Sequence, residues 1–264
     1  MASGTRPGAF SEIDWQAPWL APWRSLGQPL AQAIAEGTAV HEVLNAAGGA
    51  PVRFVPQAEL APNLAYEQFI FDTGCVPTRG NLHDFFNGLV WQRFGKAKQR
   101  LNQLQAGAIA AQGVGPVRGP LRDACTLLDE SGALLEAPPA LWHALLARDW
   151  QALFVQHRAL WRTARVTVFG HAVMEQLVQP RKGITAHVLI SQDAMHLEAD
   201  QAANLARRLQ AHWLSAKPFV PLPLLGIPGW WAGNEAPGFY DDATVFRPPR
   251  TLKSALGAAS SFDL

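Results

Sequence analysis

FDTGCVPTRGNLHDFFN, residues 71–87, places small, cationic, amide, imidazole and carboxylate residues in a turn that opens directly onto a helix. Asn81 is of a type that favours the N-cap position, where its side chain can accept a hydrogen bond from a free backbone amide. Asp84 then stands at the third helical position, where a carboxylate suits the positive end of the helix dipole. The junction therefore predicts either simple helix capping or a place where a ligand is held.

The helix that follows this junction is expected to run to about Phe94, to pause at Gly95 and to resume through Leu104. At about 100° per residue, its polar and apolar side chains separate into two arcs. The polar arc contains His83, Asp84, Asn87, Trp91, Phe94, Lys98 and Asn102, and the apolar arc contains Phe85, Phe86, Leu89, Val90 and Leu104. A solvated edge beside a core face explains this pattern as well as a polar cleft does.

The composition favours a well-buried chain with no strong electric field. Of the 264 residues, 48% are hydrophobic and 16% are charged, against roughly 25% charged residues in an ordinary soluble domain. The net charge is +1, from 22 basic and 21 acidic residues. A chain so nearly neutral has no broad basic surface for DNA, RNA or an anionic membrane, so neither a nucleic acid nor a membrane is an expected partner.

The cysteine content and the apolar runs indicate a cytoplasmic protein. Cys75 and Cys125 are the only cysteines, too few for a disulfide scaffold, and they do not form a metal-binding C-x-x-C pair. Two unpaired thiols suit a reducing compartment. No apolar run reaches the ~20 residues that a membrane-spanning helix needs, and residues 1–14 contain no signal-peptide core.

The element pattern predicts an α+β fold, a mostly helical single domain over residues 1–264 with a small, largely antiparallel sheet. An N-terminal arm, residues 1–28, carries Trp15, Trp19 and Trp23 with prolines between them, and its indoles are expected to hold it against the body. Helices are expected at Pro29–Asn45, Asn63–Phe71, Pro139–Ala147, Trp150–Thr163, Val168–Val178 and Glu198–Leu214.

Strands are expected at Val52–Val55 and Gly183–Ile190. A β-hairpin is expected from Cys125–Leu128 and Ala133–Leu135 around an Asp-Glu-Ser-Gly turn at residues 129–132. Residues 106–120 are expected to be flexible, and residues 218–264 are expected to form an irregular C-terminal wrap.

His83 is the most specific candidate for chemistry. Near a helix N-terminus the positive end of the dipole disfavours a charged imidazole, and a neutral ring can accept a proton or bind a metal. Thr78 and Arg79, with Asn81 and the amides of the helix end, could instead receive a carboxylate or phosphate. Cys75 lies eight residues before His83, so a Cys–His pair is conceivable from the sequence.

His171 and Glu175 are spaced i,i+4 on an expected helix and so share one face. With His83 and Asn87 they could form a mixed nitrogen and oxygen site of the kind that zinc or manganese accepts, or they could simply stabilise their own helix. His187 lies in an expected strand and is another candidate for the same cleft. The Arg122–Asp123 cluster is interpreted as an ordinary surface pair.

Several enzyme signatures are missing. The glycines of residues 113–119 lack the spacing of a dinucleotide-binding loop and include a proline. The sequence has no P-loop, no G-x-S-x-G and no H-E-x-x-H. No nucleotide cofactor is therefore expected, whereas a divalent metal stays possible.

The chain resembles the bacterial family known as domain of unknown function 3025. The resemblance spans most of the chain and rests on residues 74–79, 81–87 with Trp91, Lys98 and Asn102, 122–124 with Thr126, Asp129 and Glu130, 170–172 with Glu175, 183–187 and 225–231. A Phe-Pro pair expected after Trp91 is Phe94-Gly95 here, which keeps a helix break. The resemblance implies one bacterial cytoplasmic domain and implies no activity, cofactor or partner.

Two hypotheses about function follow from these residues. The first is a hydrolase of a small anionic substrate, in which His83, Asn87, His171 and Glu175 are catalytic. The anion would be held by residues of the binding set, Thr78, Arg79, Asn81, Lys98 and His187. The second is a non-catalytic protein that binds an anion or a partner through the helix junction and the tryptophan-rich segments.

Overall fold

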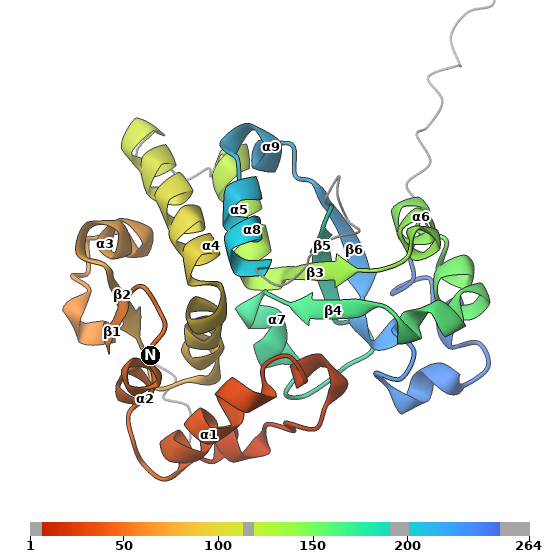
Figure 1. The fold of residues 1–264 in the computed structure, drawn as a ribbon, viewed down its shortest axis with the longest axis horizontal. Helices are drawn as coiled ribbons and strands as arrows, with labels where there is room; N and C mark the ends of the chain where they lie inside the picture. Colours follow the sequence, from red (N-terminus) through yellow and green to blue (C-terminus); the bar gives the residue numbers. More distant parts are fainter. Residues whose placement is uncertain (1–6, 113–118, 191–200, 249–264) are drawn as a thin grey trace, which may run out of the picture.

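Helix α4, Leu82–Gln112, runs through the middle of the molecule and organises the rest of the fold (Figure 1). The computed structural model describes residues 7–112, 119–190 and 201–248. The apolar arc of the first half of α4 is fully buried, with Phe85, Phe86, Leu89 and Val90 at 0% exposure. The polar arc is buried as well, with Asp84, Asn87, Lys98 and Asn102 at 5–7% exposure, so both faces of this helix are covered by other parts of the fold.

Helix α4 is kinked at Phe94, where φ is −117° and ψ is 32°. The next residue must be small, because a Cβ atom added at Gly95 would lie 2.4 Å from Cδ of Pro51. The predicted break at this position is confirmed. The helix then continues to Gln112 and not only to Leu104, so residues 106–112 are helical where flexibility was predicted, and residues 113–118 lie outside the described part of the chain.

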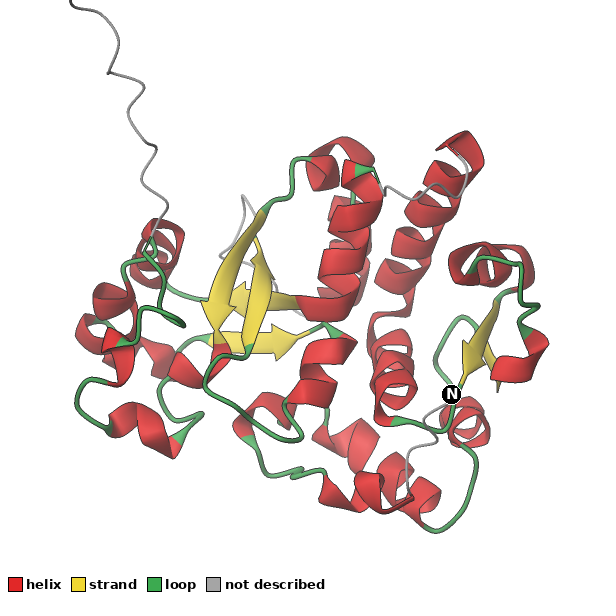
Figure 2. Cartoon of the chain, turned by 180° about the vertical axis from the view of Figure 1, so that it is seen from behind, coloured by secondary structure: helices red, strands yellow, loops and turns green. Residues whose placement is uncertain are grey.

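Two small sheets flank this central helix. The larger has the strand order β4 (Arg165–Val168), β3 (Gly132–Glu136), β5 (Thr185–Leu189) and β6 (Phe219–Pro223). Strands β3 and β5 are parallel, and the two outer pairs are antiparallel. The smaller sheet pairs β1 (Arg53–Pro56) with β2 (Cys75–Thr78) in parallel. Figures 1 and 2 show the two sheets on opposite sides of α4.

Helices dominate the remainder of the described chain, so the α+β class and the small sheet are confirmed. The other helices are α1 (Arg24–Ala35), α2 (Val40–Ala47), α3 (Tyr66–Thr73), α5 (Pro120–Ser131), α6 (Pro139–Ala147), α7 (His171–Gln176), α8 (Gln201–Arg208) and α9 (Ala211–Ser215). Helices α5, α7 and α8 all pack against α4. In the part of the chain that the structure describes, no helix is both long and apolar enough to cross a bilayer.

The predicted β-hairpin is half wrong. Residues 125–128 belong to α5 and not to a strand, whereas residues 133–135 do form part of β3. Pro120 occupies the first turn of α5, where its missing N–H costs nothing, and Ala124, Cys125 and Leu128 are buried on one helical face. The short apolar run was therefore one face of a helix, which periodicity over four residues cannot separate from a strand.

Several other predicted helices are divided in the structure. The helix expected over residues 29–45 is split into α1 and α2 at Gly37, which has a φ of 108° that favours glycine. Residues 150–163 form two short turns, Ala152–Gln156 and Arg158–Arg162. The segment 168–178 begins with the last residue of β4 before α7, and α8 and α9 replace one helix over the described part of 198–214.

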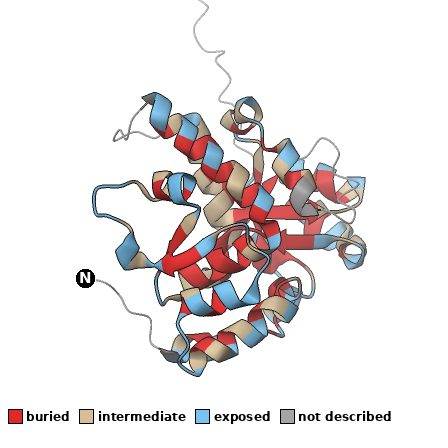
Figure 3. Cartoon of the chain, turned by 60° about the vertical axis from the view of Figure 1, so that its left-hand side comes forward, coloured by how far each residue is buried: buried red, intermediate tan, exposed pale blue. Residues whose placement is uncertain are grey.

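The described parts of the two terminal segments, residues 7–28 and 218–248, are more ordered than predicted, and residues 1–6 and 249–264 lie outside the described part of the chain. The arm contains 3₁₀ turns at Pro7–Glu12 and Pro18–Leu20 and then the start of α1, and the residues after 218 contribute the edge strand β6. Trp15, Trp19 and Trp23 are at most 8% exposed, so the indoles hold the arm in the core as predicted. Figure 3 shows buried residues of several helices and strands gathered at the centre of the fold.

Candidate active site

The junction before α4 is built from hydrogen bonds within the chain. Asn81 Oδ1 accepts a hydrogen bond from the backbone N–H of Asp84 at 2.8 Å, so Asn81 is the predicted cap. Asp84 does not complete that cap. Its carboxylate accepts hydrogen bonds from the backbone N–H, Nε and Nη2 of Arg79 at 2.6, 2.9 and 2.9 Å. The Arg79–Asp84 clamp holds the end of β2 against the first turn of α4.

Two histidines and a glutamate from three different helices meet beside this turn. The Nε2 atoms of His83 on α4 and His171 on α7 lie 3.0 Å apart. Glu130 Oε2 on α5 lies 3.5 Å from His171 Nε2 and 4.0 Å from His83 Nε2. These three atoms form a candidate metal site, with each residue offering one ligand atom.

The spacing of the three atoms fits a small divalent ion. With metal–ligand bonds of about 2.0–2.2 Å and tetrahedral angles, ligand atoms are about 3.3–3.6 Å apart. The observed separations of 3.0, 3.5 and 4.0 Å bracket that value. Two imidazoles and one carboxylate also form a ligand set that catalytic zinc sites use, with the fourth position left for water or substrate.

Glu175 fixes the orientation of His83. Its Oε2 lies 3.0 Å from His83 Nδ1, so that nitrogen carries a proton and Nε2 is left as the donor of a lone pair. The same hydrogen bond raises the pKa of His83 above its ordinary value, against the opposing effect of burial. The helix end was predicted to disfavour the charged form of this ring, whereas the Glu175 carboxylate favours it.

His171 is held neutral by its surroundings. The ring is buried, and burial lowers its pKa to about 3. Its Nδ1 atom makes no hydrogen bond, and Asp129 Oδ2 lies 3.8 Å from it. Burial opposes ionisation of Asp129, but Lys98 and His171 overcome that effect, and the pKa of this carboxyl lies below its usual value. Lys98 bonds directly to Asp129, so the carboxylate stays charged beside the ring.

A close helix contact brings His171 to Glu130. Gly170 precedes His171, and a Cβ atom added there would lie 2.4 Å from Cα of Ser131 and 2.5 Å from the carbonyl oxygen of Glu130. The backbone N–H of Gly170 also donates a hydrogen bond to the carbonyl of Gly132 at 2.8 Å. Because only glycine permits this approach, the start of α7 meets the end of α5 and the two metal-ligand candidates meet.

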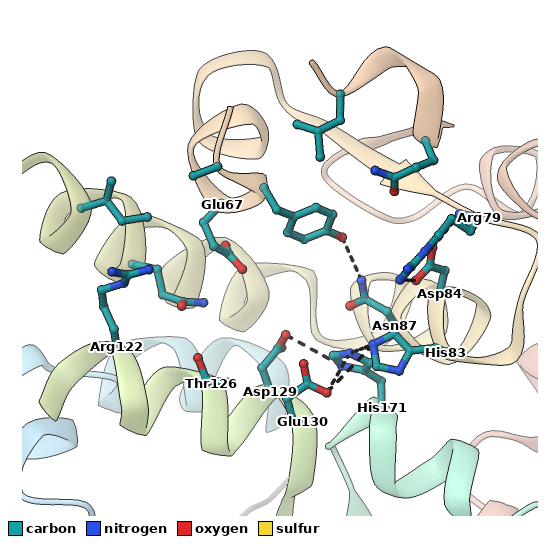
Figure 4. Close-up of a pocket in the computed structure, with 16 residues that line it drawn as sticks. Glu67, Arg79, His83, Asp84, Asn87, Arg122, Thr126, Asp129, Glu130 and His171 are labelled. Carbon is teal, nitrogen blue, oxygen red and sulfur yellow. Dashed lines mark hydrogen bonds and ion pairs between the residues drawn. The ribbon is translucent and has the colours of Figure 1, made fainter. Parts of the chain in front are cut away.

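The three residues lie at one end of a cavity of about 500 Å³ (Figure 4). The remaining lining is mostly polar and comes mainly from α3, α4 and α5, with further residues from the segment between β1 and α3 and from the turn after β2. It consists of Gln57, Leu60, Ala65, Tyr66, Glu67, Arg79, Asp84, Asn87, Gln105, Ile109, Arg122, Thr126 and Asp129. The volume lies in the range of small-molecule sites.

The wall formed by α3 and α4 carries a polar pair that faces the cavity. Asn87 Nδ2 donates a hydrogen bond to the Tyr66 hydroxyl at 3.2 Å, and Asn87 Oδ1 is buried without a hydrogen-bond partner. Burial raises the pKa of Tyr66 well above its ordinary value, so the phenol keeps its proton. With Asn87 as its donor, the Tyr66 O–H is left to donate to another group.

A second buried carboxyl belongs to Glu67. Its Oε2 accepts a hydrogen bond from Asn102 Nδ2 at 2.6 Å, and the same amide group also donates to the Glu67 carbonyl at 2.7 Å. Burial raises the pKa of Glu67, because the charged form is poorly solvated there. Asn102, a member of the predicted polar arc, therefore holds the Glu67 carboxyl in place by hydrogen bonding.

The structure brings together the four residues predicted to be catalytic. His83 and His171 touch, Glu175 bonds His83, and Asn87 lies in the cavity wall one helical turn after His83. The predicted binding set is more scattered. Arg79 lines the cavity in its clamp with Asp84, and Lys98 is buried under Asp129. Thr78 donates to the Val76 carbonyl, and neither Thr78 nor Asn81 lines the cavity.

His187 does not join this site. It lines a different cavity, of about 780 Å³, with Thr185, Pro221 and Arg247. Its Nδ1 lies 3.0 Å from the Ser131 hydroxyl, which donates to the Leu127 carbonyl. The Ser131 hydroxyl therefore donates its proton to the Leu127 carbonyl and not to His187. In an activated serine the hydroxyl would donate to the histidine, so this pair does not resemble one.

Glu130, Asp129, Tyr66, Glu67 and Arg122 are site residues that the sequence reasoning missed. Asp129 and Glu130 were interpreted as turn residues and Arg122 as part of a surface pair, because α5 was predicted to be a strand. On a helix, residues 122, 126, 129 and 130 follow the i, i+4, i+7, i+8 spacing of one face, which is the signal that could have found them. Cys75 contacts Arg53 and Thr73, not His83, and Cys125 is buried.

The fold and this site define an α+β protein with a His–His–Glu cluster at the end of a polar cavity. The chain belongs to the family described as protein of unknown function, DUF3025, whose model matches residues 52–250. No curated protein and no solved structure matches the chain. The matched region contains every residue of the cluster and the cavity, whereas the tryptophan arm precedes it.

Proposed function

We propose that the protein is a metal-dependent hydrolase with one divalent ion, zinc or manganese, held by His83, His171 and Glu130. The observation that carries the proposal is the convergence of two Nε2 atoms and one carboxylate oxygen, 3.0–4.0 Å apart, on a cavity that can admit a small molecule. Three protein ligands beside an open cavity are typical of catalytic metal sites, whereas structural zinc sites are closed by four.

Residues around the ligands support a metal centre. Glu175 would keep His83 in the tautomer that presents Nε2, as carboxylates do for metal-binding histidines. Asp129 lies 3.8 Å from the outer nitrogen of His171 and could receive its proton in a hydrogen bond once Nε2 binds an ion. Each imidazole therefore has a carboxylate near its Nδ1 atom, Glu175 for His83 and Asp129 for His171. A carboxylate in this position makes an imidazole a stronger metal ligand.

A bound divalent ion would lower the pKa of a water molecule and polarise the bond to be hydrolysed. Tyr66 is placed in the cavity wall with a free O–H and can donate a hydrogen bond to an oxygen on which negative charge develops. Glu67 retains its proton to higher pH than an exposed glutamate and can supply it to a leaving group. Asn87 orients Tyr66 and offers Oδ1 as an acceptor.

Metal analysis tests the proposal directly. Protein stripped with a chelator and reloaded should contain one zinc or manganese ion per chain by mass spectrometry. His83→Ala, His171→Ala and Glu130→Ala should each lose the ion, whereas His143→Ala, which removes an exposed histidine on α6, should keep it. Failure to bind any divalent ion, or full binding by all three variants, would refute the metal centre.

Turnover distinguishes the hydrolase from the alternative, a non-catalytic protein that binds an anion or a partner. The loaded protein should hydrolyse a member of a panel of chromogenic esters, phosphate esters and amides, and chelation should abolish the rate. The buried indoles of Trp15, Trp19 and Trp23 disfavour the alternative, since they offer little surface to a partner.

We further propose that the protein works in a bacterial cytoplasm on a small anionic molecule, without nucleic acid or membrane partners. The two free thiols support a reducing compartment, and the bacterial source rests on the family resemblance described from the sequence. The net charge of +1 supports the absence of a nucleic-acid partner.

A further inference from the structure

The cations around the cavity differ in whether they are already neutralised. Arg79 is bound by both carboxylate oxygens of Asp84, and Lys98 is bound by Asp129. Lys98 is only 5% exposed and also lies 5.5 Å from the centre of the Trp91 ring. These two residues were the ones predicted to hold an anion, yet each already has its own carboxylate.

Arg122 is in a different situation. Its side chain lines the same cavity from α5, and its Nε atom is buried without a hydrogen-bond partner. Across residues 7–112, 119–190 and 201–248, its guanidinium forms no ion pair. A guanidinium carries five N–H donors in a fork that matches a carboxylate or phosphate, and leaving a buried donor unpaired is costly.

Glu67 is the carboxyl that could be expected to neutralise Arg122, but its hydrogen bonds go elsewhere. Glu67 Oε2 accepts a hydrogen bond from Asn102. The charges of Glu67 and Arg122 interact at a distance, but the two side chains form no ion pair. Burial raises the pKa of Glu67, which further weakens it as a permanent counter-ion. The donors of Arg122 are therefore available to a molecule that enters the cavity.

The position of Arg122 sets the length of such a molecule. Arg122 and Glu130 lie on the same face of α5, eight residues apart, which is about 12 Å along a helix axis. Figure 4 shows Arg122, Thr126, Asp129 and Glu130 following one another along that wall. A cavity of about 500 Å³ has room for a small molecule that reaches from one end to the other.

We propose that Arg122 binds an anionic group of the substrate, a carboxylate or a phosphate, while the bond to be cleaved lies at the His83–His171–Glu130 centre. The proposal rests on the hydrolase proposed above and names its substrate class, a small molecule with an anion remote from the scissile bond. Uncharged polar groups of Tyr66, Asn87 and Gln105 line the same cavity.

Hydroxamates of graded length test this arrangement, because the hydroxamate group binds a metal ion and the far end can be varied. Three series would carry a terminal carboxylate, phosphonate or neutral amide, and their affinities for the metal-loaded protein would be measured by calorimetry. At the best length, one anionic series should bind about tenfold or more tightly than the amide series, as expected for a charge-assisted hydrogen bond. The better series identifies the anion.

Arg122→Gln should remove the advantage of the anionic end and leave the amide series unchanged. Arg122→Lys should keep part of the affinity advantage of the anionic series. Lys96→Gln, which removes an exposed charge on α4, should keep all of that advantage. Circular dichroism would confirm that each variant is folded. An anionic series that has no advantage in the wild type, or that keeps it in Arg122→Gln, overturns the proposal.

A second measurement separates this proposal from the metal centre. Binding of inorganic phosphate and of acetate to the chelator-treated protein would be compared between the wild type and Arg122→Gln. Weaker binding of either anion by the variant supports the Arg122 site even if no hydroxamate binds, and that combination would refute only the metal-dependent hydrolase. Equal binding by both proteins, or binding by neither, overturns the Arg122 site.

Discussion

The Nε2 atoms of His83 and His171 lie 3.0 Å apart, although 88 positions of sequence separate the two residues. Glu175 raises the pKa of His83, and burial lowers the pKa of His171. The two imidazoles in contact therefore have opposite tendencies to ionise. Protons and metal ions compete for the same nitrogen atoms. The behaviour of this pair with pH and with mutation therefore tests both the site and its supporting residues.

Glu175→Gln should weaken metal binding and change its pH dependence. The amide can still accept the Nδ1–H of His83 but lacks the negative charge that raises the pKa of that ring. Protons should therefore compete with the metal only at lower pH than in the wild type. At pH 8 the zinc affinity should still fall about tenfold or more, as for other carboxylates behind imidazole ligands.

Competition with a chromophoric chelator between pH 5.5 and 8.5 measures both effects. Glu42→Gln, an exposed glutamate on α2, should have no influence on either. A Glu175→Gln variant with the affinity and the pH profile of the wild type would show that Glu175 does not act on the metal ligand.

Burial of His171 should make the metal-free protein sensitive to acid. The pKa of His171 is about 3 in the folded state and about 6.5 in an unfolded chain. Between these values the unfolded state binds a proton that the folded state does not, so stability falls as the pH falls, by up to about 1.4 kcal/mol per pH unit. His83 has the opposite sign: its contribution is complete below about 6.5 and is lost as the pH rises through its raised folded pKa.

Urea denaturation of metal-free protein between pH 4.5 and 6.5 measures this slope. His171→Gln should reduce it by the equivalent of one proton, whereas His143→Gln should leave it unchanged because His143 is exposed. An unaltered slope in His171→Gln would mean that the folded protein can charge this ring without cost.

Lys98→Met should destabilise the protein strongly. Lys98 is the direct partner of Asp129, and both side chains are largely buried. Removing the cation leaves a buried carboxylate unpaired, which costs about 3–5 kcal/mol in comparable buried pairs. Thermal denaturation should show the loss, and Lys98→Met combined with Asp129→Leu should recover part of it because no unpaired charge is left. A double variant no more stable than Lys98→Met would contradict the pairing, and Lys96→Met serves as the exposed control.

Gly170→Ala should separate α7 from α5 and damage the metal site. The new Cβ would lie 2.4–2.5 Å from backbone atoms of Glu130 and Ser131, which cannot move aside as a side chain can. We expect a loss of about 1–3 kcal/mol in the free energy of unfolding, together with weaker zinc binding. Gly107→Ala on α4 is the matched control, since nothing lies within 4 Å of its added Cβ and alanine favours a helix. Unchanged zinc affinity in Gly170→Ala would mean that His171 does not depend on this contact.

Local patterns were sufficient for several parts of the fold and the site. Asn81 is the predicted cap of α4, the helix breaks beside Gly95, and the apolar arc of Phe85, Phe86, Leu89 and Val90 is buried. These features depend on neighbours within a few residues, so their signals are present in the sequence itself. His171 and Glu175 were predicted to share a face for the same reason, and both contact His83.

Local sequence patterns could not predict the role of α5. Residues 125–128 form a short apolar run that suits a strand and a helix equally, so Glu130 was assigned to a turn and Arg122 to the surface. Which alternative is adopted depends on packing against α4, α7 and α9, and these contacts are distant in sequence. The same limit applies to Lys98, whose partner Asp129 lies 31 positions further along the chain.

The sequence by itself determined a mostly helical α+β chain of the DUF3025 family, with a capped helix that presents His83 beside Asn87. Only the tertiary structure decided that Glu130 completes the site, that Arg79 and Lys98 are neutralised, and that Arg122 is left without a carboxylate partner among the residues described. The physical reason is the distance along the sequence over which each interaction acts. Capping and helical periodicity act over one or two turns, whereas the pairing of charges and ligands is set by which helices meet in the core.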